Sequence, residues 1–148
     1  MPDELLTLDR IVLSRATSKQ AALTELARLA APTLGLPPTA IAMALTAREA
    51  LGSTGVGGGI ALPHARLAGL AAPAAFLMRL DRPADWGAID GKPADLVFLL
   101  LSPDGADNAH LAALAAMTRL LRTPGAAAAI RAAKDTASVW RIAVGAAE

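Results

Sequence analysis

The strongest candidate for a reactive side chain in this sequence is His64, one of only two histidines. It follows Pro63, which closes the predicted strand 60–62, and a side chain at a strand end can project into a cleft. An imidazole with the ordinary pKa of about 6.5 is largely neutral at neutral pH, so one ring nitrogen can act as a nucleophile. The residue alone also allows a plainer interpretation, in which His64 is a hydrogen-bonded surface histidine.

The second histidine, His110, lies in the first turn of the predicted helix 108–122. It shares a helical face with the apolar residues that follow at spacings of four, seven and eleven, namely Leu114, Met117 and Leu121. His110 is therefore expected to point inward. Two roles fit this position: a hydrogen-bonded core residue, or a group that reaches a site at the helix N-terminus, where anions are favoured.

A third candidate, Arg48, falls in register with the apolar residues of the predicted helix 39–51. A guanidinium on such a face needs a partner, because an unpaired buried charge is very costly. A phosphate would satisfy it through two parallel hydrogen bonds, and a carboxylate such as Glu49 or Asp90 would serve as well. A structural ion pair or a side chain that extends to solvent is the alternative.

Between that helix and His64 lies a glycine-rich loop, 52–59, in which five of the eight residues are glycine. This content predicts irregular backbone. The loop lacks the lysine of a P-loop, the third glycine of a dinucleotide-binding motif and the first glycine of a GxSxG elbow. What remains is either a backbone that can aim several N–H groups at one anion, or a flexible turn.

No metal site or cofactor is predicted. The chain has no cysteine, and its histidines do not show HExxH-type spacing. The absence of cysteine also excludes disulfides and thiolate chemistry, and it favours a reducing, intracellular location.

Composition narrows the class of protein. The 148 residues are expected to form a single domain, 1–148, and the 54% of hydrophobic residues predicts a substantial core. A formal net charge of +1 and only 3% aromatic residues argue against a nucleic-acid partner. No apolar run approaches the roughly 20 residues that span a bilayer, and the first ten residues do not resemble a signal peptide. We therefore expect a cytoplasmic protein without membrane insertion.

The elements that must position these residues alternate along the chain, which predicts an α/β domain with a mixed sheet of about four or five strands flanked by helices. The best strand is 95–101, whose continuous apolar run indicates burial on both faces. Ser18 and Gly35 are typical caps for a helix over 18–34. The other predicted strands are 11–13, 60–62 and 74–80, and the other predicted helices are 39–51, 108–122, 125–134 and 137–145.

Residues 48–66 taken as one motif identify a protein family far more specifically than any of the residues does alone. They read Arg48-Glu-Ala-Leu-Gly-Ser-Thr-Gly-Val-Gly-Gly-Gly-Ile-Ala-Leu-Pro-His64-Ala-Arg66. This segment closely resembles the active-site segment of EIIA components of the bacterial phosphotransferase system, in the fructose/mannitol class, and most of all the nitrogen-regulatory EIIA. The likeness continues through 86–98 and the helix that His110 begins, and covers about 5–145. Ala65 stands where the family usually has glycine, and Leu62 where it often has isoleucine.

The resemblance implies the mannitol-type EIIA fold and a phosphotransferase. In that interpretation His64 is the phosphoryl acceptor, His110 stabilises the phosphoryl group and Arg48 neutralises its charge. The loop residues Ser53, Thr54 and Gly55 would lie beside the phosphate.

The partners that the resemblance implies are an HPr-like (NPr-like) phosphocarrier as donor and regulatory targets such as ion transporters or sensor kinases. No EIIB or EIIC domain is attached to the chain, which favours the regulatory member. Two alternatives stay open: a stand-alone fructose/mannitol-type EIIA that passes phosphate to a separate EIIB, and a docking protein on the same fold without phosphotransfer. An unrelated phosphate- or nucleotide-binding domain has only the glycine loop in its favour.

Overall fold

A computed structural model of the chain describes residues 5–105 and 107–147. Its centre is a mixed six-stranded sheet with the order β1-β5-β6-β3-β2, in which β4 also pairs with β6. Strand β6 is parallel to β3 and β4 and antiparallel to β5, while β1 is parallel to β5. The strands are β1 (Ile11–Ser14), β2 (Gly55–Gly57), β3 (Ile60–Ala61), β4 (His64–Leu67), β5 (Ala74–Ala84) and β6 (Ala94–Pro103).

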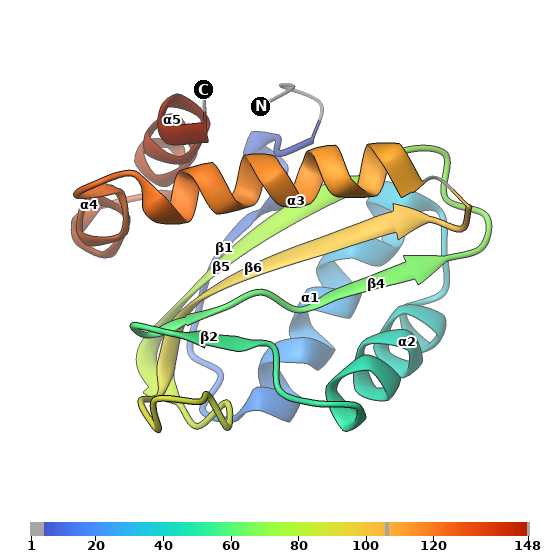
Figure 1. Cartoon of the computed structure of the whole chain (residues 1–148), viewed down its shortest axis with the longest axis horizontal. Helices are drawn as coiled ribbons and strands as arrows, with labels where there is room; N and C mark the ends of the chain where they lie inside the picture. The colour runs from blue at the N-terminus through green and yellow to red at the C-terminus, as the bar shows by residue number, and fades with distance from the viewer. Residues whose placement is uncertain (1–4, 106, 148) are drawn as a thin grey trace.

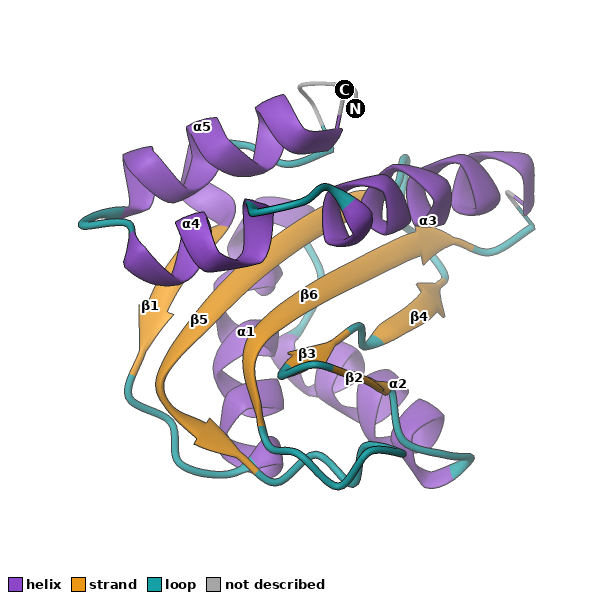
Figure 2. Cartoon of the chain, turned by 60° about the vertical axis from the view of Figure 1, so that its left-hand side comes forward, coloured by secondary structure: helices purple, strands orange, loops and turns teal. Residues whose placement is uncertain are grey.

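Helices cover both faces of this sheet (Figures 1 and 2). One face carries α1 and α2, and the other carries α3, α4 and α5. The helices are η1 (Leu8–Arg10), α1 (Lys19–Leu34), α2 (Pro38–Ala50), α3 (Asp107–Arg122), α4 (Ala126–Ala132) and α5 (Thr136–Ala147). No helix within 5–105 or 107–147 combines the length and apolar character that crossing a membrane requires.

The two central strands explain why the core has two halves. Side chains alternate across a strand, so Phe76 and Leu99 pack toward α1 and α2, while Leu77 and Phe98 pack toward α3 and α5. All four are fully buried. The continuous apolar run that predicts burial on both faces is confirmed in β6.

Local capping defines α1 as the sequence predicts. Ser18 is its N-cap, with Oγ accepting a hydrogen bond from the Ala21 amide at 3.0 Å, and Gly35 ends it with φ 67°. Helices α2, α3, α4 and α5 also lie where they are predicted, with small differences at their ends.

The prediction that the whole glycine loop is irregular is wrong at its centre, although 52–54 and 58–59 lie outside strands and helices as predicted. Residues 55–57 form β2, which pairs antiparallel with β3 and makes a small hairpin. Its turn uses Gly57, Gly58 and Gly59 at φ 92°, 66° and 81°, a region that other residues rarely adopt. The glycines thus permit a tight hairpin rather than preventing regular structure. This hairpin and the separate short β4 raise the strand number to six.

The place of His64 also differs from the prediction. The predicted strand 60–62 ends early, at Ala61, and His64 begins a new strand, β4, instead of following the end of the previous one. In the register of β4 with β6, His64 lies opposite Leu100. Its backbone is therefore held by the central strand of the sheet.

Candidate functional site

Three residues that lie far apart in the sequence meet in one pocket. Arg48 comes from the last turn of α2, His64 from the start of β4 and His110 from the first turn of α3. The pocket has a volume of about 510 Å³. Its lining residues are Ala44, Ala47, Arg48, Leu51, His64, Ala65, Arg66 and His110.

The His64 ring is oriented by a backbone carbonyl. Its Nδ1 lies 2.9 Å from the carbonyl oxygen of Leu62. A carbonyl only accepts hydrogen bonds, so Nδ1 must carry the proton. The lone pair of the neutral ring then sits on Nε2, which has no partner among the described residues. This is the tautomer that a nucleophilic Nε2 requires.

His110 is almost fully buried, with 6% of its surface exposed. Its Nδ1 lies 2.6 Å from the Ser102 hydroxyl, and its ring centroid is 6.1 Å from that of His64. Burial lowers the pKa of His110 below the ordinary histidine value. The positive charge of Arg66 and the electrostatic interaction with His64 lower this pKa further, while Asp107 acts in the opposite direction. The fold thus favours the neutral form of the His110 imidazole relative to the unfolded chain.

Arg48 has most of its donors free. Its Nη1 donates to the Gly52 carbonyl at 2.8 Å, and no described carboxylate pairs with it. The two carboxylates considered as partners are used elsewhere: Glu49 pairs with Lys19, and Asp90 accepts from the Gly58 amide. The half-buried guanidinium therefore keeps several N–H groups for an anion in the pocket.

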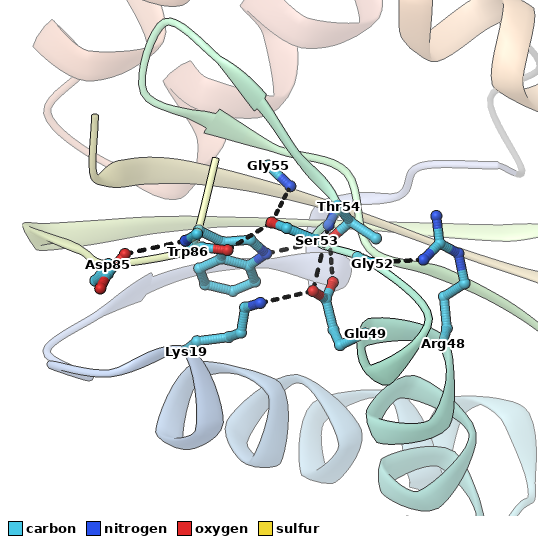
Figure 3. A network of polar contacts seen from close by, with 10 residues as sticks. Lys19, Arg48, Glu49, Gly52, Ser53, Thr54, Gly55, Asp85 and Trp86 are labelled. Atoms are coloured by element: carbon cyan, nitrogen blue, oxygen red, sulfur yellow. Dashed lines mark hydrogen bonds and ion pairs between the residues drawn. The ribbon is translucent and has the colours of Figure 1, made fainter. Parts of the chain in front are cut away.

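The predicted loop residues do not line this pocket. The Ser53 hydroxyl donates to the Trp86 carbonyl at 2.5 Å and accepts from the Gly55 amide at 3.0 Å. The Thr54 hydroxyl bonds to Glu49 and accepts from the Trp86 indole N–H at 3.1 Å. Figure 3 shows these contacts on one side of the loop and Arg48 on the other.

Gly55 is required for close packing rather than for a turn. A Cβ at this position would lie 2.8 Å from the Cβ of Ala88. That is closer than real Cβ contacts, so the loop that follows β5 can approach the hairpin only because residue 55 lacks a side chain.

Three further residues hold groups in or beside the site, and the sequence predicts this role for none of them. Arg66 lines the pocket and forms an ion pair with Asp107 in the first turn of α3. Ser102 holds His110, and Glu49 anchors Thr54. Arg66 and Glu49 lie inside the motif 48–66, whereas Ser102 has no signal beyond its place at the end of an apolar strand.

Comparison with known proteins identifies the family of this chain. Residues 4–143 match the family described as phosphoenolpyruvate-dependent sugar phosphotransferase system, EIIA 2. A nitrogen regulatory protein of Bradyrhizobium diazoefficiens is 44% identical over 128 residues, which are 86% of this chain and 84% of that protein.

Solved structures show the same fold. The crystal structure of nitrogen regulatory protein IIA-Ntr from Neisseria meningitidis matches with a TM-score of 0.89 and 32% identity, over 95% of this chain and 97% of that one. The mannitol enzyme IIA of Escherichia coli, solved in a complex with phosphorylated enzyme IIB, matches with a TM-score of 0.79 and 17% identity, over 95% and 99% of the two chains.

This chain therefore belongs to the EIIA type 2 family of the phosphotransferase system, a family that acts in phosphoryl transfer. Within the family it is similar to nitrogen regulatory proteins, as the resemblance of residues 48–66 predicts. The mannitol-type fold is likewise confirmed.

Proposed function

We propose that the protein is a regulatory phosphocarrier that accepts a phosphoryl group on Nε2 of His64. The observation that supports this most directly is the pairing of two features in one pocket. His64 has a free Nε2 lone pair, and Arg48 and His110 beside it can hold an anion. The donor would be a phosphohistidine on an HPr-like (NPr-like) carrier.

In the proposed step, the lone pair of His64 Nε2 attacks phosphorus as the N–P bond of the donor breaks. The leaving electron pair returns to the donor imidazole, and the Nδ1 proton of His64 stays on its bond to Leu62. Such a transfer depends mainly on in-line positioning and on stabilising the equatorial oxygens. Arg48 supplies positive charge and His110 a neutral hydrogen-bond donor.

The roles of Ser53, Thr54 and Gly55 as phosphate ligands stay a prediction. The hydroxyls of Ser53 and Thr54 and the amide of Gly55 bond within the polar network around Trp86, so we propose that any phosphate contact they make follows a local rearrangement. Without it, their role is to fix the position of Arg48 and of the hairpin that leads to His64.

The regulatory assignment rests on the relatives, which are named nitrogen regulatory proteins. The phosphoryl group itself carries about −2 of charge at neutral pH. The ring that keeps its Nδ1 proton becomes cationic, so the net change is about −1, against a formal net charge of +1. Phosphorylation would cancel this net positive charge and place a dianionic group in the pocket, and would thereby change the surfaces against which the protein can dock. We propose ion transporters or sensor kinases in the cytoplasm as the readers of this state.

The test is phosphorylation with purified components. The protein is incubated with phosphoenolpyruvate, enzyme I and an HPr-like carrier, and its intact mass is measured before and after mild acid. We expect one acid-labile phosphoryl adduct that is absent in His64→Ala and that forms more slowly in His110→Ala. An adduct that survives His64→Ala, or no adduct on the folded wild-type protein, contradicts the proposal.

A further inference from the structure

Ser102 is a fully buried hydroxyl with a single partner. It lies near the end of β6, opposite Arg66 in the register of β4, and has 0% of its surface exposed. Among the described residues its Oγ makes one hydrogen bond, 2.6 Å to Nδ1 of His110. A buried hydroxyl proton without an acceptor is costly, so the direction of this one bond has consequences for the site.

The direction follows from counting protons. A neutral imidazole carries one N–H, and Nδ1 of His110 can either donate to Ser102 or accept from it. If Nδ1 donated, the Ser102 proton would have no described acceptor. If Nδ1 accepts, that proton is satisfied and the N–H of His110 moves to Nε2. The second arrangement leaves only the Nε2–H without a protein partner, and Nε2 is not among the fully buried, unpartnered side-chain atoms of the described residues, so this N–H can bond to water or to a ligand in the pocket. The lowered pKa of His110 favours the neutral ring.

We propose that Ser102 is a positioning residue that holds His110 as the Nε2–H tautomer, a hydrogen-bond donor toward the pocket. His64 is held in the opposite tautomer by the Leu62 carbonyl. The ring centroids are 6.1 Å apart. His64 then offers a nucleophilic Nε2, and His110 offers an Nε2–H that can donate a hydrogen bond to a phosphoryl group on His64. The effect on transfer rests on the proposed function, whereas the tautomer does not.

The tautomer is measured directly on the unphosphorylated protein, without any partner. In a long-range ¹H–¹⁵N spectrum of the histidine rings, we expect His110 to show a protonated Nε2 and an acceptor-type Nδ1. His64 should show the reverse. In Ser102→Ala the Nδ1 resonance of His110 should move toward that of an unbonded acceptor nitrogen, and Ser102→Thr should restore it.

A matched control is available in Ser14. It is another buried strand serine, with 2% exposure, whose hydroxyl bonds to Glu25 outside the pocket. Ser14→Ala should leave the His110 resonances unchanged. A protonated Nδ1 on wild-type His110, or an Nδ1 resonance that is the same in Ser102→Ala, overturns the proposal.

The second measurement is single-turnover transfer from the phosphorylated HPr-like carrier. Ser102→Ala should slow it roughly tenfold, the scale of losing the partner that orients a histidine. The double variant Ser102→Ala/His110→Ala should be no slower than His110→Ala alone, because Ser102 acts through that ring. Additive losses contradict this role. Absence of transfer in the wild type would refute the proposed function while leaving the ring spectra to decide the tautomer.

Discussion

Arg48 and Glu49 are neighbours in the sequence, yet they serve two polar regions of opposite character. Glu49 belongs to the glycine-loop network, which we define as Lys19, Glu49, Ser53, Thr54 and Trp86 (Figure 3). Arg48 belongs to the pocket with His64 and His110. Successive residues of a helix point about 100° apart, so one turn of α2 can supply both regions.

In the glycine-loop network the polar groups are satisfied by each other. Glu49 accepts from Lys19 at 2.7 Å and from the Thr54 amide at 3.2 Å, and it also bonds to the Thr54 hydroxyl. The Lys19 ammonium lies 5.6 Å from the Trp86 ring, and the indole N–H is bonded as well.

In the pocket, by contrast, Nε2 of each histidine and most donors of Arg48 have no partner within the described part of the chain. The network therefore stabilises the fold, whereas the pocket contains polar groups without protein partners, which the proposed function requires.

The largest expected effect is a loss of stability when the glycine-loop network is broken at Glu49. Glu49→Ala removes a carboxylate whose side chain is 8% exposed and leaves Lys19 and both Thr54 donors without their acceptor. We expect the free energy of unfolding to fall by about 3 kcal/mol, the lower end for breaking a buried pair because Lys19 can still reach water. Urea denaturation measures this loss.

Glu49→Gln is the matched control, because it keeps the shape and one acceptor oxygen while removing the charge. It should cost less, about 1–2 kcal/mol. Both variants should accept phosphate at near wild-type rates once the measurement is corrected for the folded fraction. A hundredfold loss of transfer in folded Glu49→Gln would abolish the distinction between the two regions.

The next effect belongs to the pocket. Arg48→Ala should slow phosphoryl transfer about 10²-fold, equivalent to about 2.7 kcal/mol, the scale of losing one preorganised donor to a developing charge. Its stability should change by less than about 0.5 kcal/mol, because the side chain makes one hydrogen bond and no ion pair among the described residues. Single-turnover transfer and urea denaturation of the same sample test both halves.

Arg48→Lys sharpens this test. It keeps the charge but loses the planar fork that binds two phosphate oxygens. We expect its transfer rate to lie between those of Arg48→Ala and the wild type, because the charge is kept and the second hydrogen bond to the phosphate is lost. An Arg48→Ala protein that transfers normally but unfolds easily would assign Arg48 to the structural side of the comparison.

A smaller effect probes the interior of the network. Thr54→Val is nearly isosteric and removes the hydroxyl that links Glu49 to the Trp86 indole. With Thr54 only 4% exposed, we expect a loss of about 2 kcal/mol, because two buried groups lose their partner. Trp86→Phe combined with Thr54→Val should show coupling in the urea midpoints. Fully additive losses would mean that the hydroxyl and the indole do not act as a unit.

These two regions also show what the sequence can and cannot predict. Helix α1 is predictable because its caps are local: Ser18 and Gly35 mark its ends whatever packs against it. The hairpin of β2 and β3 is not, because it depends on a long-range partner, β6, and on glycines at positive φ that look like breakers when read locally.

The site residues also fall into a group that the sequence predicts and a group that it does not. Arg48, His64 and His110 stand out by residue type and by a specific motif, and the structure places all three in one pocket. Ser102 and Glu49 do not, because a serine or a glutamate becomes informative only when packing shows which group it holds. The sequence alone cannot decide whether a carboxylate pairs with Arg48. That decision needs the positions of Glu49 and Asp90, which only the tertiary structure provides.

The smallest effect is a slope in the dependence of stability on pH, and it should come from His110. Its pKa in the folded protein is lowered, by burial first and then by Arg66 and His64, with Asp107 opposing. As the pH falls, the unfolded chain therefore binds a proton at its ordinary pKa of about 6.5 before the folded protein does. Stability should decrease from about pH 7 down to the lowered pKa of His110 and then level off, because both states are then protonated.

The slope cannot exceed about 1.4 kcal/mol per pH unit for one proton. His110→Asn removes the titrating ring, so subtracting its urea-derived stability curve from that of the wild type isolates the contribution of His110. The carboxylates with lowered pKa, Asp90 and Asp135, titrate below their ordinary value of 3.8 and fall outside this window. Parallel curves for the two proteins would show that burial in the pocket does not penalise the charged ring, and would remove the argument that His110 is held neutral beside His64.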